Sequence, residues 1–218
     1  YPNGQVQCWG DPEHLPAFSG SDFTSVTVGR TYACALSATA EVTCDGDDDF
    51  GQISGIPNGA RFVAIDAGNY TTCGITESGE LFCWGNLASN TIESAHPFVQ
   101  LSVGTDGVCA IDSQGQLFCA SAGFAPDPAV ASETPDGRFS MVSVGDQVAC
   151  ALTIGLGELV CWGTTNTFQP ILDGQPESAF IQIGVGYAHA CGIKPDGSLE
   201  CWGEALFEEN NIQALGNP

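Results

Sequence analysis

The stretch that decides the fold runs from Phe180 to Gly203 and reads FIQIGVGYAHACGIKPDGSLECWG. An alternating segment leads to a Gly turn and then to Cys191, and a second turn at Gly197 leads to Cys201. Alternating apolar and polar residues indicate β-strands, and Gly-containing breaks between them indicate tight turns. The stretch therefore predicts one unit of three or four short antiparallel strands.

Four more copies of this frame precede it, each with a leading Phe, a Gly and two Cys. They are Phe23 with Cys34 and Cys44, Phe62 with Cys73 and Cys83, Phe98 with Cys109 and Cys119, and Phe139 with Cys150 and Cys161. Five complete units thus recur at a period near 39 residues. A repeat of this length built from short strands is typical of a propeller blade. We predict an all-β fold, a β-propeller of about six to seven blades, with a β-solenoid as the alternative.

The repeat also divides the chain, which we expect to form a single β-propeller domain over residues 1–218. Gly- and Pro-rich segments join successive units and mark their approximate limits. The predicted units are 1–22 (partial), 23–61, 62–97, 98–138, 139–179, 180–210 and 211–218 (partial).

The 11 cysteines are too many for a reduced cytosolic protein without a metal. Four pairs are 10 residues apart and the fifth is 11 apart, which places each pair opposite across a hairpin. Structural zinc is the competing explanation, but zinc sites usually contain Cys pairs two to four residues apart, and the sequence has none. We predict the disulfides Cys34–Cys44, Cys73–Cys83, Cys109–Cys119, Cys150–Cys161 and Cys191–Cys201.

Cys8 has no partner in this scheme. Residues 2–10 match residues 195–203 position for position, so Cys8 is the second cysteine of a unit whose first half is absent. Residues 211–216 resemble the opening strand of a unit. Three interpretations stay open: a piece of a longer array, two ends that share one blade, or a neighbouring chain that supplies the missing strand and thiol.

The motif Gly-x-x-x-x-Cys-x-Ile/Leu, followed by x-Gly-x-Leu/Val-x-Cys-Trp-Gly, resembles the regulator of chromosome condensation repeat in its disulfide-bearing bacterial or extracellular form. The resemblance covers nearly the whole chain and implies a β-propeller, often of seven blades. Residues 44–52 resemble the Trp-Gly-x-Asn-x-x-Gly-Gln turn of the family, with Asp45 in the Trp place and Asp48 in the Asn place. Trp is also lost at Ala120.

The nucleotide-exchange activity of the founding member is not expected here, since disulfides and scarce cations argue against a chromatin role. The net charge is −22, with only four Lys and Arg residues. So few cations cannot neutralise many phosphates, which disfavours nucleic acid and anionic membrane surfaces. The sequence contains no run of 18 apolar residues, so we do not expect membrane insertion.

Candidate sites are few. Clustered carboxylates favour Ca²⁺, so Asp45, Asp47, Asp48 and Asp49 are weak calcium candidates, although the repeat explains most of this run as a turn. Asn69 begins a glycosylation sequon, Asn-Tyr-Thr. The position of His189 holds a different residue in each of the other units, which disfavours a catalytic role. We predict no catalytic residue and no cofactor. The recurrent Trp residues Trp9, Trp84, Trp162 and Trp202 favour packing over carbohydrate stacking.

These observations predict a secreted, extracellular or cell-surface protein without enzymatic activity. Its expected role is structural or protein-interacting, with a protein partner or self-assembly, as in a subunit of a surface filament or layer. The alternatives are a secreted propeller-type enzyme inhibitor, since bacterial relatives of the repeat include β-lactamase inhibitors, and a propeller hydrolase or lyase.

Overall fold

The computed structural model describes residues 4–10, 16–20, 22–86, 92–105, 107–121, 129–163 and 171–203, and it contains five three-stranded antiparallel sheets. Each sheet is formed by one sequence unit, as the repeat predicts. The strands are β1 (Phe23–Val28), β2 (Tyr32–Ser37), β3 (Val42–Gly46), β4 (Phe62–Ala67), β5 (Thr71–Thr76), β6 (Leu81–Gly85), β7 (Phe98–Val103), β8 (Gly107–Asp112), β9 (Leu117–Ser121), β10 (Phe139–Val144), β11 (Val148–Thr153), β12 (Leu159–Gly163), β13 (Gln182–Val185), β14 (His189–Ile193) and β15 (Leu199–Gly203).

The two cysteines of each unit are paired directly across the second and third strands of the sheet. All five pairs are disulfide-bonded, with Cα–Cα distances of 4.0 to 4.1 Å. Cross-strand residues at non-hydrogen-bonded positions approach this closely, so the hairpin itself brings the thiols together. The extra residue of the fourth unit is absorbed in its turn, which contains two positive-φ glycines, Gly155 and Gly157.

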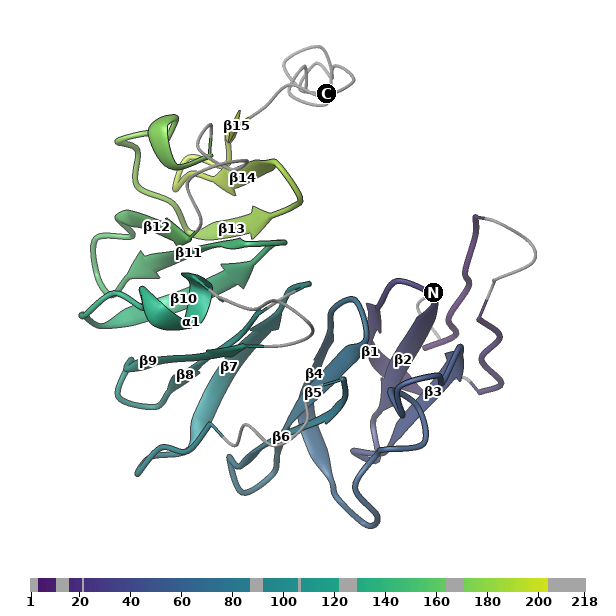
Figure 1. The fold of residues 1–218 in the computed structure, drawn as a ribbon. Coiled ribbons are helices and arrows are strands. Elements are labelled where there is room, and N and C mark those ends of the chain that lie inside the picture. Colours follow the sequence, from purple (N-terminus) through teal and green to yellow (C-terminus); the bar gives the residue numbers. More distant parts are fainter. Residues whose placement is uncertain are drawn as a thin grey trace.

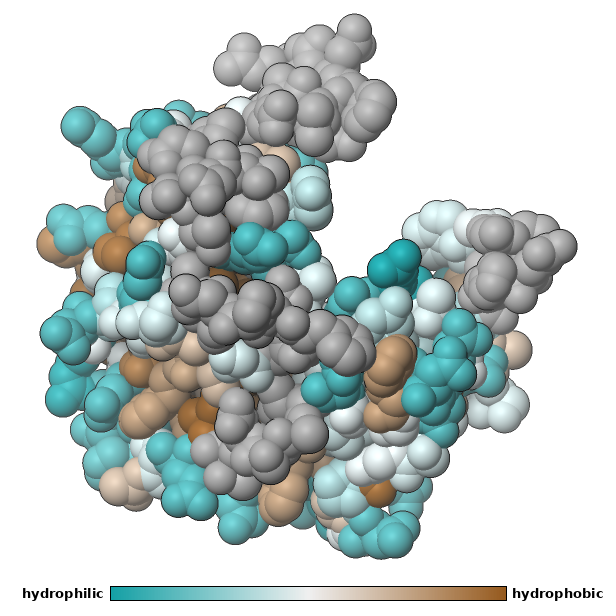
Figure 2. Space-filling view, in the orientation of Figure 1, coloured by the Kyte–Doolittle hydropathy of each residue, from teal (hydrophilic) through white to brown (hydrophobic). Residues whose placement is uncertain are grey.

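The sheets follow one another around an open arc, with the first and last sheets at its two ends (Figure 1). Each sheet packs on the next one along the chain. The space-filling view shows the same open outline between the two ends (Figure 2). This is a β-propeller architecture, and the described residues supply five blades of it. We number these blades 1 to 5 in chain order.

One backbone hydrogen bond recurs at every junction between blades. The N–H of each leading Phe donates to the carbonyl of a positive-φ residue in the preceding hairpin turn. The pairs are Phe62 to Ala40 (2.9 Å), Phe98 to Gly79 (2.8 Å), Phe139 to Gly115 (2.8 Å) and Phe180 to Gly157 (2.9 Å). The left-handed turn residue therefore both closes its own hairpin and positions the next blade.

The linkers between blades cover the recurrent Trp side chains of the repeat. Trp84 Nε1 donates to the carbonyl of Gln52, and Trp162 Nε1 donates to the carbonyl of Val130, each at 3.0 Å. Val130 lies in a short helix, α1 (Ala129–Ser132). Ile171 belongs to the same apolar cluster as Trp202, whose Nε1–H has no hydrogen-bond partner among the described residues. In blades 2, 4 and 5, the linker that precedes the blade thus covers its Trp.

Candidate interaction site on the first blade

A ladder of side chains joins neighbouring blades near the end of each leading strand. At this position, one blade presents an oxygen-bearing side chain, and the next blade donates a backbone N–H to it. The pairs are Ala67 N to Thr27 Oγ1 (2.9 Å), Val103 N to Asp66 Oδ2 (2.8 Å), Val144 N to Ser102 Oγ (3.0 Å) and Val185 N to Ser143 Oγ (3.0 Å). The equivalent position in blade 5 is Gly184, so the ladder has no side chain there.

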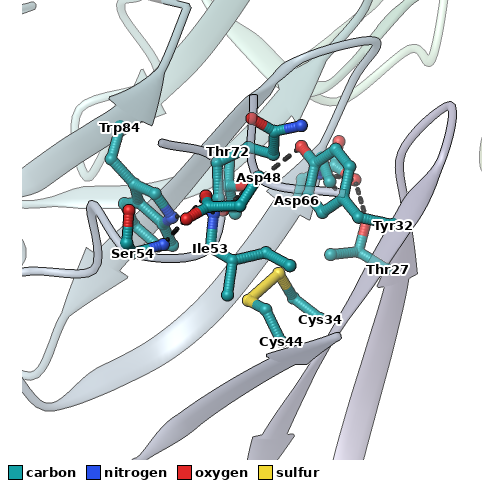
Figure 3. The surroundings of a disulfide bond; sticks show 12 residues. Thr27, Tyr32, Cys34, Cys44, Asp48, Ile53, Ser54, Asp66, Thr72 and Trp84 are labelled. Carbon is teal, nitrogen blue, oxygen red and sulfur yellow. Dashed lines mark hydrogen bonds between the residues drawn. A yellow bond between two sulfur atoms is a disulfide. The ribbon is translucent and has the colours of Figure 1, made fainter. Parts of the chain in front are cut away.

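Asp66 is the one carboxylate in this ladder. Its Oδ1 accepts the Thr27 hydroxyl and its own blade's Ala67 N–H, each at 2.9 Å. Burial between the blades raises the pKa of Asp66, because loss of solvent penalises the ionised form more than these donors favour it. Nearby, the Thr72 hydroxyl donates to Tyr32 Oη at 2.9 Å, and burial raises the pKa of Tyr32 to about 12 (Figure 3).

Glycines form a second contact between the blades. A Cβ on Gly68 or Gly104 would lie 1.9 Å from the carbonyl oxygen of the equivalent Gly in the next blade, and one on Gly145 would lie 2.2 Å from it. No side chain fits at such distances, so these positions require Gly because of the close approach of two backbones. Gly186 occupies the same place in blade 5, where the nearest atoms belong to the His189 side chain at 3.2 Å.

Blade 1 differs from the later blades because, among the described residues, no sheet packs against its leading strand from the preceding side. Val28 is 67% exposed, whereas its equivalents Ala67, Val103 and Val144 are 6–7% exposed. Val26 is 49% exposed, whereas its equivalent Val142 is 1% exposed. Aliphatic residues that form the blade interface elsewhere are therefore open to solvent on this blade.

Residues 4–10 lie beside this open strand in the place of a third strand. Phe23 N–H donates to the carbonyl of Gly4 at 3.1 Å, and Gly4 has a φ of 71°. This repeats the junction bond of the other four blades, so Gly4 is a hairpin-turn residue and Cys8 stands where the second cysteine of a blade stands. The positive φ values of Gly4 and Gly10 match those of Gly197 and Gly203, in agreement with the alignment of residues 2–10 with residues 195–203, but residues 4–10 do not pair as a strand.

We define the first flank as Val6, Cys8, Trp9, Val26 and Val28. These residues, with Tyr32 and neighbouring backbone, line a cavity of about 370 Å³. Cys8 is half-buried and is the free cysteine of the described residues. Trp9 is 87% exposed, whereas Trp84, Trp162 and Trp202 are 5–7% exposed. The linker that would cover Trp9 is the one before its own unit, and no described residue takes that place.

The acidic run after β3 forms a turn. Asp48 Oδ1 accepts the N–H groups of Ile53 and Ser54, at 2.7 and 3.0 Å, and the Ser54 side chain with these N–H groups lowers the pKa of Asp48 (Figure 3). The same turn carries the buried Gln52, whose carbonyl accepts the Trp84 Nε1–H. Asp45 Oδ2 accepts the N–H of Ala17 at 2.7 Å. The described residues contain no group of three His, Cys, Asp or Glu that converges on a metal position, and calcium binding at Asp45, Asp47, Asp48 and Asp49 stays a prediction.

The other predicted residues are separated on the fold. Asn69 lies in the turn between β4 and β5, where its carbonyl accepts Arg30 N–H at 3.3 Å, and its glycosylation stays a prediction. His189 begins β14, near Gly186. Sequence reasoning missed the ladder of Thr27, Asp66, Ser102 and Ser143, although the repeat frame would have shown a small polar residue in four of five units.

Residues 62–90 match the model of the regulator of chromosome condensation (RCC1) repeat. The other units share its frame of Phe, Gly and paired Cys. The segment 62–90 is therefore assigned to the regulator of chromosome condensation repeat. The resemblance inferred from the motif is thereby confirmed, and so is the propeller fold.

Solved propellers resemble this chain over most of its length. The WD40 ectodomain of the Arabidopsis thaliana receptor kinase ACR4 is 25% identical with a TM-score of 0.74, covering 87% of this chain and 69% of that one. The ectodomain of the Physcomitrella patens receptor kinase CR4 is 23% identical with a TM-score of 0.71, covering 84% of this chain and 53% of that one. Yeast RCC1 (Prp20), solved with Kap60, is 20% identical with a TM-score of 0.69, covering 90% and 59%.

The chain thus spans between about half and about two thirds of these solved chains. Within the described residues, no helix has the length and apolar character needed to cross a membrane.

Proposed function

We propose that this chain is an extracellular, non-enzymatic module that binds a protein partner. The observation that carries the proposal is the position of the five disulfides. Each bond lies within one blade, and Cys34, Cys73, Cys109 and Cys150 are fully buried. Such bonds stabilise each hairpin and its turn without linking blades, which suits a rigid scaffold that presents loops.

Two observations support an extracellular location. Disulfides persist in oxidising compartments, and this chain has five of them. The fold also resembles the ectodomains of two plant receptor kinases. A mass measurement of the protein from its native source, with free thiols alkylated before reduction, tests this point. Five closed hairpin disulfides are the expected result. A protein isolated with these cysteines reduced would contradict an extracellular role.

Within this class, we favour a subunit of a surface filament or layer, because blade 1 leaves an aliphatic surface open at one end of the arc. Electron microscopy of the purified protein is the direct test. Ordered filaments or sheets are expected, and discrete particles at every concentration would contradict assembly. A secreted enzyme inhibitor is the second candidate, favoured by the exposed apolar turn of blade 4, where Ile154 and Leu156 are 53% and 69% exposed.

A further inference from the structure

We propose that Asn58 is a site of spontaneous covalent modification, at which its side-chain amide is converted to a carboxylate through a cyclic imide formed with the backbone nitrogen of Gly59. The site lies in the linker between blades 1 and 2, in the stretch Pro57-Asn58-Gly59-Ala60. This modification changes the covalent state of the chain and is independent of the proposed binding role.

The linker makes a tight turn at this point. Ala60 N–H donates to the carbonyl of Pro57 at 3.2 Å, and Gly59 has a φ of 74°. A bond between the first and fourth residues, with a positive φ at the third residue only, is the pattern of a type II turn, which favours Gly at that place. Asn58 and Gly59 are therefore the two central residues of a defined turn.

The tip of the turn projects from an anchored linker. Ile56 and Ala60, on either side of the tip, pack against the apolar cluster that contains Trp84. Asn58 and Gly59 are exposed, and apart from its chain neighbours no atom lies within 4 Å of where a Cβ on Gly59 would be. Nothing in the described part of the chain accepts the Gly59 N–H. The side-chain amide and the backbone nitrogen that attacks it are thus both open to water.

The reaction needs these two residues and water as the co-reactant. The backbone nitrogen of Gly59 loses its proton and attacks Cγ of Asn58, so that an N–Cγ bond forms, the Cγ–Nδ2 bond breaks and ammonia leaves with the proton. Water then opens the cyclic imide at either carbonyl carbon and leaves a carboxyl group. Opening at the backbone carbonyl gives isoaspartate, and opening at Cγ gives aspartate. No atom is oxidised or reduced.

The residue that follows distinguishes Asn58 from the other described asparagines, Asn69 and Asn86. Gly has no Cβ, so its nitrogen can approach Cγ without steric hindrance. Asn69 and Asn86 are followed by Tyr and Leu, whose side chains adjoin the nitrogen that would attack. Asn86 is also half-buried, and its own N–H donates to the carbonyl of Tyr70 at 2.8 Å. These two asparagines are internal controls in the same chain.

The product carboxylate would change the charge of a hollow beside blade 2. Asn58, Arg61, Glu77 and Phe82 are among the residues that line this hollow of about 540 Å³, and Arg61 Nε lies 3.2 Å from Glu77 Oε2. A carboxylate at position 58 places one more negative charge at the hollow that holds this pair. Isoaspartate also adds a backbone carbon between linker residues that pack around Trp84. The modified chain therefore has a more acidic hollow and a longer linker.

Ageing of the intact native protein in mildly alkaline buffer, followed by peptide mapping at intervals, is the test. We expect Asn58 to lose its amide at least about tenfold faster than Asn69 and Asn86, which corresponds to about 1.4 kcal/mol of activation free energy. The mass gain from exchange of NH₂ for OH identifies the product, and chromatography separates isoaspartate from aspartate. Mildly acidic buffer should slow the reaction, because the nitrogen must lose its proton. An Asn58 amide that is lost no faster than that of Asn69 would overturn the proposal.

Two variants test the site and the attacking group separately. Asn58→Gln should keep its amide, because the longer side chain would have to close a larger and less favourable ring. Gly59→Ala should slow the loss, because a methyl group then adjoins the nitrogen. The same mass gain in N58Q would place the modification elsewhere in the chain. Equal rates in G59A and the wild type would refute attack by this nitrogen.

Discussion

The interface between blades 3 and 4 and the open flank of blade 1 are built from the same repeat positions, yet they lie in opposite environments. Val142 is 1% exposed in the first and Val26 is 49% exposed in the second. A Cβ on Gly104 would lie 1.9 Å from the Gly145 carbonyl oxygen, whereas the nearest atom to a Cβ on the equivalent Gly186, at the other end of the arc, is 3.2 Å away in the His189 side chain. The difference shows that the repeat specifies an interface whether or not the described chain supplies its other half.

The sharpest test of this difference is a methyl group at the close backbone contact. Gly104→Ala should lower the free energy of unfolding by about 3 kcal/mol, since a Cβ at 1.9 Å from the Gly145 oxygen forces two blades apart. Gly186→Ala should change it by less than about 1 kcal/mol, because the His189 side chain can shift. Denaturant unfolding with the disulfides intact measures both. Equal losses would show that blade 5 is as constrained as blade 3.

Removal of aliphatic side chains tests the same contrast in apolar burial. Val142→Ala should destabilise the protein by about 2 kcal/mol, because it removes two methyl groups from a buried cluster and leaves a small cavity. Val26→Ala should cost about 0.5 kcal/mol or less, since its side chain is half exposed. Thermal unfolding of the two variants provides the comparison. A larger loss for Val26 would mean that the flank is already covered.

The hydrogen-bond ladder lacks a side chain at Gly184 in blade 5, and the same gap can be introduced in blade 4 by mutation of Ser143. Ser143→Gly should cost about 1 kcal/mol, because it removes the acceptor of Val185 N–H and leaves a donor without its partner. Gly184→Ser adds a hydroxyl where nothing lies within 4 Å of a Cβ, so it should be nearly neutral. Hydrogen exchange at Val185 N–H reports the first effect directly, and unchanged protection would contradict the assignment.

The smallest expected effect is a pH dependence at Asp66. Its folded pKa is raised by burial, so the stability linked to its protonated form is fully present below its unfolded pKa and is lost as pH rises through the folded pKa. Asp66→Ser installs the residue found at positions 102 and 143 and should remove this contribution to the pH profile. Unfolding free energies of both proteins across the acidic range, subtracted at each pH, isolate it. An unchanged profile would refute the role of burial.

Much of this molecule could be predicted from local spacing. The 10- and 11-residue Cys separations predicted the hairpin disulfides, because a short antiparallel hairpin places such residues opposite each other. The period near 39 predicted the blades, and the match of residues 2–10 with residues 195–203 predicted that Cys8 is the second cysteine of a unit, which the turn at Gly4 supports. Each of these depends on contacts between residues close in sequence, where chain geometry leaves few choices.

The tertiary structure alone decided which equivalent residues are buried. Trp9 and Trp84 have the same local sequence context, but a linker covers only Trp84. The ladder at Asp66 and the close approach of Gly104 to Gly145 join residues about 40 positions apart, and no local pattern shows which blade lies beside which. The sequence by itself determined the repeated unit and its disulfides. Packing decided which interface positions of the repeat are buried and which, at the first flank, are exposed. Burial depends on neighbouring residues that lie far away in sequence, and local sequence does not specify them.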